Sequence, residues 1–474
     1  MSNIAELIRS RADHQAILEA ASRLGREQGT YPYLVGGYVR DLLLRRENHD
    51  IDLVVEGDGI AFARELGRRL GVDRIVPFEQ FGTALIPLKG TQVEVATART
   101  ETYDADSRKP HVQAGTIEVD LARRDFTINA LAASIHPDTF GDLVDPFRGV
   151  QDMNSGILRT PLDPDVTFSD DPLRMLRAAR FAAQLGYTIT PECLESITRQ
   201  KKRIAIVSRE RITDEIMKLL TADKPSIGFV ILKETGLLAL IFPELDAMSG
   251  AEVRDGQGHK DVLSHTLQVV DNAAAVSSKV ELRFAALVHD IGKPRTKRYD
   301  DQRGWTFYHH EEVGRKMLHE VAQRMRLSGD LRDYLMKLTR LHLRPIALAG
   351  EGVTDSAVRR LMREAGEDVD DLMILCRADI TTKQVARQAR YMANFERVEV
   401  LMADVTLRDE MRAFQSPVRG DEIMAVCCIE PGPRVGRLKT TIEEAILEGQ
   451  IKNTHAAALA YLHEIKDQTL SSES

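Results

Sequence analysis

The sequence predicts an α+β fold class, with strands and helices mixed in about the first 144 residues and helices in the remainder. Two observations lead to this prediction. Apolar runs with strand-like patterning and nearby glycines lie within Leu34–Val55 and Thr83–Thr97, whereas charged segments with helical periodicity dominate the later chain. The length of 474 residues exceeds what one hydrophobic core serves, so about three or four domains are expected.

The composition is that of an ordinary globular protein, with 43% hydrophobic and 29% charged residues. A formal net charge of −8 gives no overall basic signature, so any nucleic-acid partner must be held by local clusters. No run approaches the roughly 20 apolar residues of a membrane-spanning helix. The N-terminal segment has apolar residues at helical spacing broken by charges, which resembles an amphipathic helix and not a signal peptide. We therefore expect a cytoplasmic protein with no membrane partner.

Two features of Leu34–Val55 carry chemistry. Gly36 and Gly37 separate a short apolar segment from a helical one, an arrangement that brings backbone N–H groups close to an anion, although an ordinary turn looks the same. Asp50 and Asp52 follow on a strand, where residues two apart share a face. Buried carboxylates are costly unless they are paired or bound to metal, so this pair favours Mg²⁺.

A third carboxylate, Glu94, lies between Val93 and Val95 in the second of two strand-like runs. Three carboxylates on neighbouring strands could hold two metals, one activating a hydroxyl nucleophile and one steadying a leaving pyrophosphate. The alternative is that Glu94 is an exposed glutamate on an edge strand and binds no metal.

Three further motifs follow in order, and together they resemble a known family. The glycine pair continues as GGYVRD, followed by DID, then RRDFTINAL at Arg123–Leu131 and DDPLRMLRAARF at Asp170–Phe181. This order is similar to that of the class II tRNA nucleotidyltransferases, the CCA-adding enzymes, with bacterial poly(A) polymerases as close relatives. The resemblance implies a polymerase beta-like nucleotidyltransferase head with a mixed sheet at residues 1–144, a helical neck at 145–223, a helical body with an HD metal domain at 224–387, and a helical tail at 388–474.

The resemblance also assigns roles within the head. Asp50, Asp52 and Glu94 would be catalytic, and Gly36, Gly37 and Arg40 would bind the nucleotide. Arg124 and Asp125 would contact the ribose, and Asn129 would help to hold the triphosphate, although a salt-bridged helix start remains the alternative. A charged loop with Tyr103, Arg108, Lys109 and Pro110 corresponds to the flexible loop that the family uses in the switch from C to A, and its full length argues against an enzyme that adds only CC.

The neck offers a candidate base reader on a helix expected to open with Asp170 and Asp171. A carboxylate that accepts and a guanidinium that donates fit the amine and ring nitrogen of cytosine and adenine and reject uracil and guanine. Asp171 and Arg174 would form this pair, and Arg177 and Arg180 would extend it as a basic face. A surface salt bridge is the alternative. Glu210, Arg211 and Glu215 resemble an element that braces this helix, so we expect them to be structural.

The second half carries histidines and aspartates in the order shown by HD-type metal phosphohydrolases. The expected metal ligands are His265, His289, Asp290 and Asp379, with His310 and His342 as possible ligands of a second metal and Lys293 as a phosphate contact. Imidazole with carboxylate suits Mn, Fe, Ni, Co or Mg and leaves water positions free. Singly, each histidine is more often a satisfied core residue.

These residues predict template-independent addition of CCA to the 3′ end of tRNA, from CTP and ATP with Mg²⁺. The partners would be tRNA, ATP and CTP, and we infer no protein partner. The alternatives are an enzyme that adds only the terminal A, a poly(A) polymerase, or an HD phosphohydrolase acting on nucleotides or RNA ends. The tail would bind tRNA through Arg434, Arg437 and Lys439. The alternative is that this segment only caps the helical fold.

Overall fold

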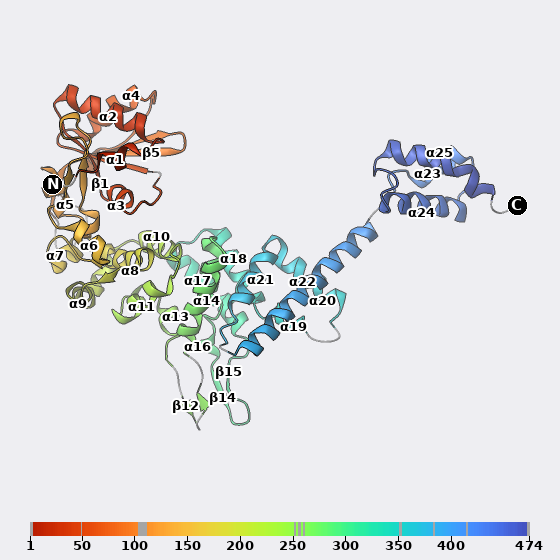
Figure 1. The fold of residues 1–474 in the computed structure, drawn as a ribbon. Helices are drawn as coiled ribbons and strands as arrows, with labels where there is room; N and C mark the ends of the chain where they lie inside the picture. The colour runs from red at the N-terminus through yellow and green to blue at the C-terminus, as the bar shows by residue number, and fades with distance from the viewer. Residues whose placement is uncertain are drawn as a thin grey trace. The chain divides into compact units, whose positions relative to one another are not determined.

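The computed structural model describes residues 3–48, 50–102, 111–250, 253–254, 257–258, 261–349, 353–382, 384–413 and 416–471. The chain forms two compact units, residues 1–347 with 364–395 and residues 348–363 with 396–474 (Figure 1). The charged loop with Tyr103, Arg108, Lys109 and Pro110 lies outside the described residues. Among the described helices, none has the length and the apolar composition that crossing a bilayer requires.

A seven-stranded mixed sheet forms the core of the N-terminal part. Its order is β3-β4-β5-β2-β1-β8-β9, in which β2 and β5 run parallel and the other neighbours antiparallel. This sheet, with the helices around and after it, confirms the predicted α+β class. The strands are β1 (Pro32–Val35), β2 (Asp50–Val55), β3 (Val76–Phe78), β4 (Thr83–Leu88), β5 (Thr91–Thr97), β8 (Ala132–Ser134) and β9 (Leu143–Val144).

Strand β2 lies between two apolar cores. Ile51, Leu53 and Val55 are fully buried in the main hydrophobic cluster, as strand alternation predicts. Val54 points the other way, into a second cluster that includes Ile117 and other residues of α5. The helices of this region are α1 (Ala5–Arg9), α2 (Gln15–Gln28), α3 (Gly37–Leu43), α4 (Gly59–Arg69) and α5 (Ile117–Ala122).

The remainder of the first unit is largely helical and shares one continuous core with the sheet. Its helices are α6 (Gly149–Ser155), α7 (Pro164–Asp170), α8 (Leu173–Leu185), α9 (Pro191–Gln200), α10 (Arg209–Leu220), α11 (Ser226–Glu234), α12 (Leu238–Ile241), α13 (Pro243–Asp246), α14 (Val262–Val276), α15 (Val280–Val288), α16 (Lys293–Thr296), α17 (His310–Met325), α18 (Gly329–Leu341), α19 (Arg344–Ala347) and α21 (Val369–Ala378).

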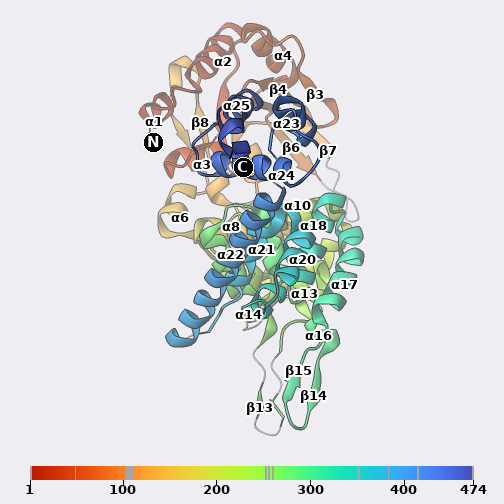
Figure 2. The ribbon, with the colours of Figure 1, turned by 90° about the vertical axis from the view of Figure 1, so that its right-hand side faces the viewer.

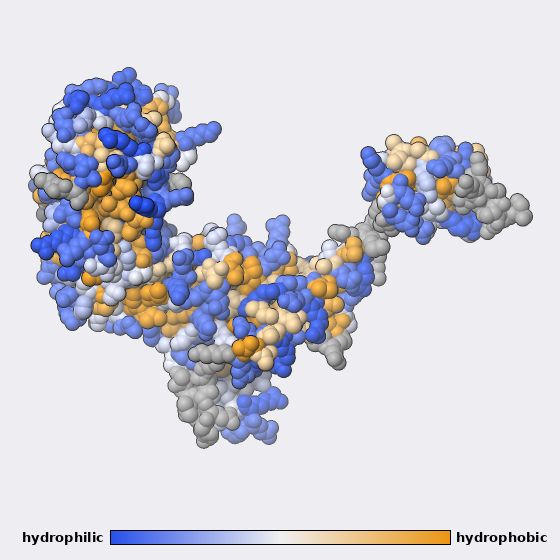
Figure 3. Space-filling model, viewed as in Figure 1, coloured by the Kyte–Doolittle hydropathy of each residue, from blue (hydrophilic) through white to orange (hydrophobic). Residues whose placement is uncertain are grey.

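Short strand pairs interrupt these elements. They are β6 (Arg99–Thr102) with β7 (His111–Ala114), β10 (Ile157–Leu158) with β11 (Thr188–Ile189), β12 (Val253–Arg254) with β13 (Gln257–Gly258), and β14 (Arg298–Asp300) with β15 (Gly304–Thr306). Figure 2 shows the last two pairs side by side, projecting from the helices. In Figure 3 polar residues cover most of the face seen there, and apolar residues gather over part of the head and neck.

The second unit has a small helical core of its own, built from Val418, Ile423, Leu438, Ile442, Ala458 and Leu462 among others. Its helices are α23 (Gly420–Cys427), α24 (Pro433–Leu447) and α25 (His455–Ser471), while α20 (Asp355–Ala365) and α22 (Val385–Ala413) belong to both units. The basic residues expected to contact tRNA, Arg434, Arg437 and Lys439, lie within α24.

Candidate active site and candidate metal centre

The glycine turn of the sequence motif connects β1 to α3, as predicted. Gly36 has φ +63°, a left-handed conformation that side chains other than glycine rarely adopt. A Cβ atom here would also lie 2.5 Å from Nη1 of Arg124. The turn therefore needs glycine both for its backbone and for the close approach of the Arg124 guanidinium.

Two of the predicted carboxylates meet on adjacent strands. In the parallel register of β2 and β5, Asp52 lies opposite Glu94, and Asp50 lies opposite Gln92. Because β5 has β4 on its other side, Glu94 is not on an edge strand, although its side chain is exposed. Asp50, at the start of β2, is exposed as well.

The electrostatics of Asp52 suit a cation. Burial, and after it the charges of Glu94 and Asp50, raise the pKa of Asp52 to about 6, against the opposing effect of Arg124 and Arg40. A divalent ion beside Asp52 and Glu94 would relieve both the desolvation and the repulsion. Carboxylate oxygens are the donors that Mg²⁺ prefers, so the residues present fit the predicted ion.

A cavity of about 500 Å³ joins the sheet to the neck helices. Of the predicted head and neck residues, all but Asp50 line this cavity: Gly36, Gly37, Arg40, Asp52, Glu94, Arg124, Asp125, Asn129, Asp171, Arg174, Arg177 and Arg180. The structure adds Thr83, Arg99, Arg123, Phe181 and Arg211. The lining holds eight arginines and four carboxylates, an excess of guanidinium groups that suits a polyphosphate.

Asp125 is the centre of a buried network at the floor of the cavity. Its Oδ1 accepts hydrogen bonds from the backbone N–H of Phe126 and from Nδ2 of Asn129, both at 2.9 Å, and its Oδ2 accepts from Nε of Arg177 at 2.7 Å. Burial alone would raise the pKa of Asp125, but Arg177 and Asn129 hold it at about 2. Asn129 also accepts a hydrogen bond at 2.7 Å from Arg40. Asp125 is therefore an ionised anchor for Arg177 and Asn129.

The candidate base reader differs from the expected helical pair. Asp171 does not open the helix. It lies in extended backbone between α7 and α8, where its Oδ1 accepts from the N–H of Leu173 at 3.1 Å. Arg174 turns inward and donates to the carbonyls of Thr167 at 3.2 Å and Arg123 at 2.6 Å. The reason is local, because Pro172 begins a new helix after the chain leaves α7 at Asp170.

Two of the cavity residues that were not predicted as part of a site, Arg211 and Phe181, contact predicted ones. Arg211 on α10 donates to Oδ2 of Asp171 at 2.8 Å, although its motif indicated only a structural brace. The ring of Phe181 lies under the guanidinium groups of Arg40, Arg177 and Arg180, at 5.1, 5.2 and 4.1 Å from its centroid. The brace itself is present, because Nε of Arg180 donates to Glu215 at 2.6 Å.

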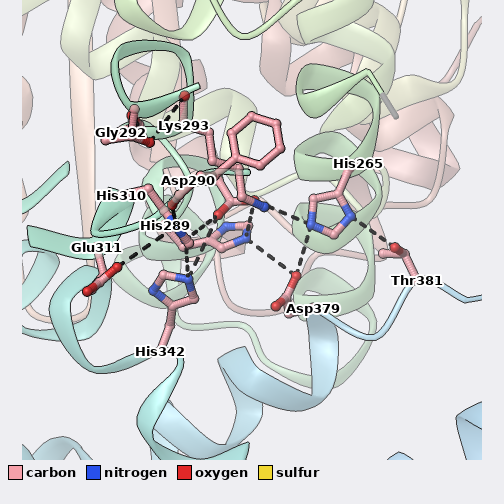
Figure 4. Close-up of polar contacts among 12 residues, drawn as sticks. His265, His289, Asp290, Gly292, Lys293, His310, Glu311, His342, Asp379 and Thr381 are labelled. Atoms are coloured by element: carbon pink, nitrogen blue, oxygen red, sulfur yellow. Dashed lines mark hydrogen bonds and ion pairs between the residues drawn. The ribbon is translucent and has the colours of Figure 1, made fainter. Parts of the chain in front are cut away.

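The predicted HD ligands gather from five helices into two groups (Figure 4). His265 on α14, His289 at the end of α15 and Asp379 at the end of α21 form the first group. Asp290, His310 at the start of α17 and His342 at the end of α18 form the second. Within each group the ligand atoms lie within 4.8 Å of one another.

Asp290 faces both groups. Its Oδ2 lies 3.2 Å from Nε2 of His289 and 3.5 Å from Nε2 of His265, whereas its Oδ1 lies 3.2 Å from Nε2 of His310 and 3.8 Å from that of His342. Buried Nε2 of His289 and Oδ1 of Asp290 have no hydrogen-bond partner among the described residues. Buried polar atoms without partners are unusual, and a shared pair of metal ions would satisfy both of them.

The other ring nitrogens are already held. Nδ1 of His289 lies 2.8 Å from the carbonyl of Ala286, that of His310 lies 2.8 Å from the carbonyl of Phe307, and that of His342 lies 2.6 Å from the carbonyl of Thr339. Donation to a carbonyl fixes the tautomer, so Nε2 is left as the ligand atom. Lys293 adds a cation, with Nζ 2.5 Å from Oδ2 of Asp290.

Three family models match successive parts: Poly A polymerase head domain over residues 32–159, Probable RNA and SrmB-binding site of polymerase A over 186–249, and HD domain over 262–384.

Two curated relatives are each named Multifunctional CCA protein. The one of Shewanella frigidimarina is 33% identical over 379 residues, covering 76% of this chain and 86% of that protein. The one of Chromobacterium violaceum is 38% identical over 341 residues, covering 69% and 78%.

Solved structures share the fold. The apo form II of a CCA-adding enzyme superposes with a TM-score of 0.59 at 23% identity, covering 98% of this chain and 99% of that one. A tRNA nucleotidyltransferase complexed with a primer tRNA and an incoming ATP analog gives 0.56 at 24%, covering 80% and 99%. Together with the family models and the curated relatives, these findings show that the chain belongs to the family of CCA-adding tRNA nucleotidyltransferases and poly(A) polymerases and carries an HD domain.

Proposed function

We propose that the head and neck add CCA to the 3′ end of tRNA, using CTP and ATP without a nucleic-acid template. The observation that carries this proposal is the cavity in which Asp52 and Glu94 face eight arginines, with Asp171 and Arg174 on its neck side. The names of the relatives support tRNA as the acceptor, and we place the activity in the cytoplasm, where tRNA and both nucleotides occur.

Each wall of the cavity has one task in this reaction. Asp50, Asp52 and Glu94 would hold Mg²⁺, which supplies charge neutralisation at the phosphates when bound. Arg40, beside the glycine turn, would bind the triphosphate together with Asn129, and Arg124 would contact the ribose. The tRNA 3′ oxygen attacks the α-phosphorus, the bond from that phosphorus to the bridging oxygen breaks, and pyrophosphate leaves with the electron pair.

Base selection would use Asp171 and Arg174. Oδ1 of Asp171 accepts from the N–H of Leu173 and from Nη1 of Arg211, whereas Oδ2 has one described donor, Nη2 of Arg211, and retains a lone pair that can accept from the exocyclic amine of cytosine or adenine. Arg174 uses two N–H groups on carbonyls and retains others that can donate to a ring nitrogen. Uracil and guanine would leave these buried groups unpaired.

The test is incorporation of labelled nucleotides into three tRNAs that end at the discriminator base, at C and at CC, with CTP and ATP offered separately. We expect CMP on the first two and AMP on the third. Absence of CMP on the first tRNA would instead support an enzyme that adds only A, and unlimited AMP addition would support a poly(A) polymerase.

We further propose that the HD region hydrolyses phosphoesters of nucleotides or RNA ends. What favours this second function is the pair of buried ligand groups that share Asp290, with partnerless Nε2 of His289 and Oδ1 of Asp290. Mn, Fe, Ni, Co or Mg would suit these donors and would supply a metal-bound water when present. Lys293, beside Asp290, would bind the phosphate oxygens.

The measurement is opening of a 2′,3′-cyclic nucleotide to its phosphomonoester and release of p-nitrophenol from bis(p-nitrophenyl) phosphate, with each metal added in turn. In the reaction, water adds to phosphorus, one P–O ester bond breaks, and the water's proton ends on the released alcohol. No hydrolysis with any metal would overturn this second function and leave the first intact.

A further inference from the structure

The β14–β15 hairpin takes part in neither site described above, yet it connects two elements that carry HD ligands. It follows α16, which begins three residues after Asp290, and it ends shortly before His310, the first residue of α17. Figures 1 and 2 both show it projecting from the helical body. A projection at this point in the chain can contact a substrate that the buried ligands alone cannot reach.

Aromatic side chains are set on one face of the hairpin. Tyr299 is paired with Trp305 in the antiparallel register, so their side chains lie on the same face. Their rings meet edge to face, 5.2 Å apart at 73°. Trp305 is the single tryptophan of the chain, and Nζ of Lys297 lies 4.5 Å from the centre of its ring. Trp305 is half-buried, so part of its ring surface is open to solvent.

Tyr308 adds an exposed aromatic ring between the hairpin and His310 along the chain. Its side chain is 60% exposed, and its hydroxyl accepts a hydrogen bond at 2.9 Å from Nη1 of Arg303. The ring is therefore held in place while its face remains open. A held aromatic face beside an arginine is a stacking surface for a nucleobase.

The net charge of the hairpin segment is opposite in sign to the net charge of the whole chain. Between residues 295 and 309 there are four Lys or Arg residues and two aspartates, whereas the whole chain carries −8. Asp300 stabilises the turn of the hairpin, because its Oδ1 accepts hydrogen bonds from the N–H groups of Gln302 and Arg303, at 2.9 Å each. Figure 3 shows this projection as hydrophilic. Aromatic faces among basic residues are typical of sites for single-stranded nucleic acid.

The base of the hairpin contacts the candidate metal centre. The carbonyl of Phe307 lies 2.8 Å from Nδ1 of His310, and the ring of Phe307 lies 5.9 Å from Nζ of Lys293. Lys293 in turn contacts Asp290 at 2.5 Å. A strand that stacks its bases along Trp305 and Tyr308 would therefore bring its terminal phosphate toward Lys293 and the ligands.

We propose that the β14–β15 hairpin is a stacking platform that binds the single-stranded end of an RNA and presents its terminal phosphate to the HD centre. This inference rests on the hydrolytic function proposed above. It makes the preferred substrate of that centre an RNA end, and not a free nucleotide.

The first experiment compares two substrates of the metal-loaded full-length protein. One is a short single-stranded RNA with a terminal 2′,3′-cyclic phosphate, and the other is bis(p-nitrophenyl) phosphate. For Tyr308→Ala and Trp305→Ala we expect kcat/KM to fall about tenfold on the RNA, chiefly through KM, and to change less than twofold on the small ester. Tyr308→Phe should retain the activity on RNA, because stacking needs the ring and not the hydroxyl.

A matched control is Tyr31→Ala, which removes another exposed tyrosine, 41% accessible, from the head. It should change neither substrate. Equal losses on both substrates in Tyr308→Ala would overturn the proposal, because they indicate support of the metal ligands alone. Unchanged activity on both would overturn it as well.

The second experiment separates this inference from the proposed hydrolysis. The wild-type protein is irradiated with an RNA carrying a 3′-terminal 4-thiouridine 3′-phosphate, and the crosslinked peptides are identified by mass spectrometry. Crosslinks to residues 297–308 support the platform even if no hydrolysis is found with any metal. Hydrolysis of the RNA without such crosslinks would contradict RNA binding by the hairpin and leave the proposed hydrolytic function intact. A protein partner would then be the next candidate ligand of the hairpin.

Discussion

The two candidate metal regions of this chain differ in how complete they are. In the head, Asp52 and Glu94 lie on adjacent strands at an open cavity, and Asp50 is exposed. In the HD region, the ligands lie mostly buried, with three of four histidines already oriented through Nδ1 by backbone carbonyls. In the proposed functions, the head would complete its metal site with substrate phosphates, whereas the HD region offers enough protein ligands to hold metal and still leave positions for water.

The chemistry of the donors follows the same division. The head presents carboxylates and arginines, a set that suits Mg²⁺ arriving with a nucleoside triphosphate. The HD region presents imidazole with carboxylate, a set that binds transition metals without substrate. Substitutions in each region test this difference in how the two sites would hold metal.

The largest expected effect comes from Asp52→Asn. Removal of a metal-binding charge should lower nucleotide incorporation into tRNA by about 10³-fold or more, while hydrolysis by the HD region stays unchanged. Asp73→Asn, which alters an exposed carboxylate of the head, is the matched control and should be silent. Retention of incorporation in Asp52→Asn would remove Asp52 from the catalytic residues.

A second substitution, Asp290→Asn, probes the shared ligand. Because Asp290 faces both groups, its replacement should lower the affinity of the protein for both metals by about 10²-fold. It should also abolish hydrolysis. Metal content of the purified protein, measured by mass spectrometry, reads this directly, with exposed Asp330→Asn as control. Loss of one metal alone would contradict the shared position, and CCA addition should remain normal.

The neck offers a third, smaller effect. Arg174 donates hydrogen bonds to two backbone carbonyls, so only its remaining N–H groups can contact the base. Arg174→Ala should relax the preference for CTP and ATP over UTP and GTP by about 10- to 100-fold, measured as the ratio of kcat/KM values. Arg199→Ala, a partly exposed arginine of α9, should preserve the preference.

The smallest effect is a pH dependence of stability. The pKa of Asp52 is raised from 3.8 to about 6 by burial and by Glu94, so the folded state binds this proton more tightly than the unfolded state does. Its favourable contribution is complete below about pH 4 and is lost as the pH rises through about 6.

Asp52→Asn should therefore stabilise the metal-free protein at pH 7 by about 1–2 kcal/mol and have little effect at pH 4. Denaturant unfolding at both pH values checks this. Equal effects at the two pH values would show that repulsion and burial at Asp52 are not the cause.

The sequence could predict what depends on short-range order. Strand alternation placed Ile51, Leu53 and Val55 in the core, and the glycine pair marked the turn from β1 to α3. These two features need only local periodicity. The predicted HD ligands also come together, but their set followed from the resemblance to HD-type metal phosphohydrolases and not from periodicity.

Contacts that depend on tertiary packing could not be read in this way. Arg211 shows only helical spacing in the sequence, and its approach to Asp171 follows from how α10 packs against α8. Asp171 was expected inside a helix, but the break before Pro172 leaves it in extended backbone. The platform residues Tyr299 and Trp305 meet through strand pairing that no motif marked.

One consequence follows from the position of β2 between two cores. Its backbone is paired with β5 on one side and β1 on the other, and apolar clusters cover both of its faces. Amide hydrogens of Ile51 to Val55 should then be among the last of the head to exchange with deuterium, opening only with global unfolding. The strand that carries Asp52 would thus stay rigid through every round of nucleotide addition, and adjustments for a changing RNA end would fall to the surrounding elements.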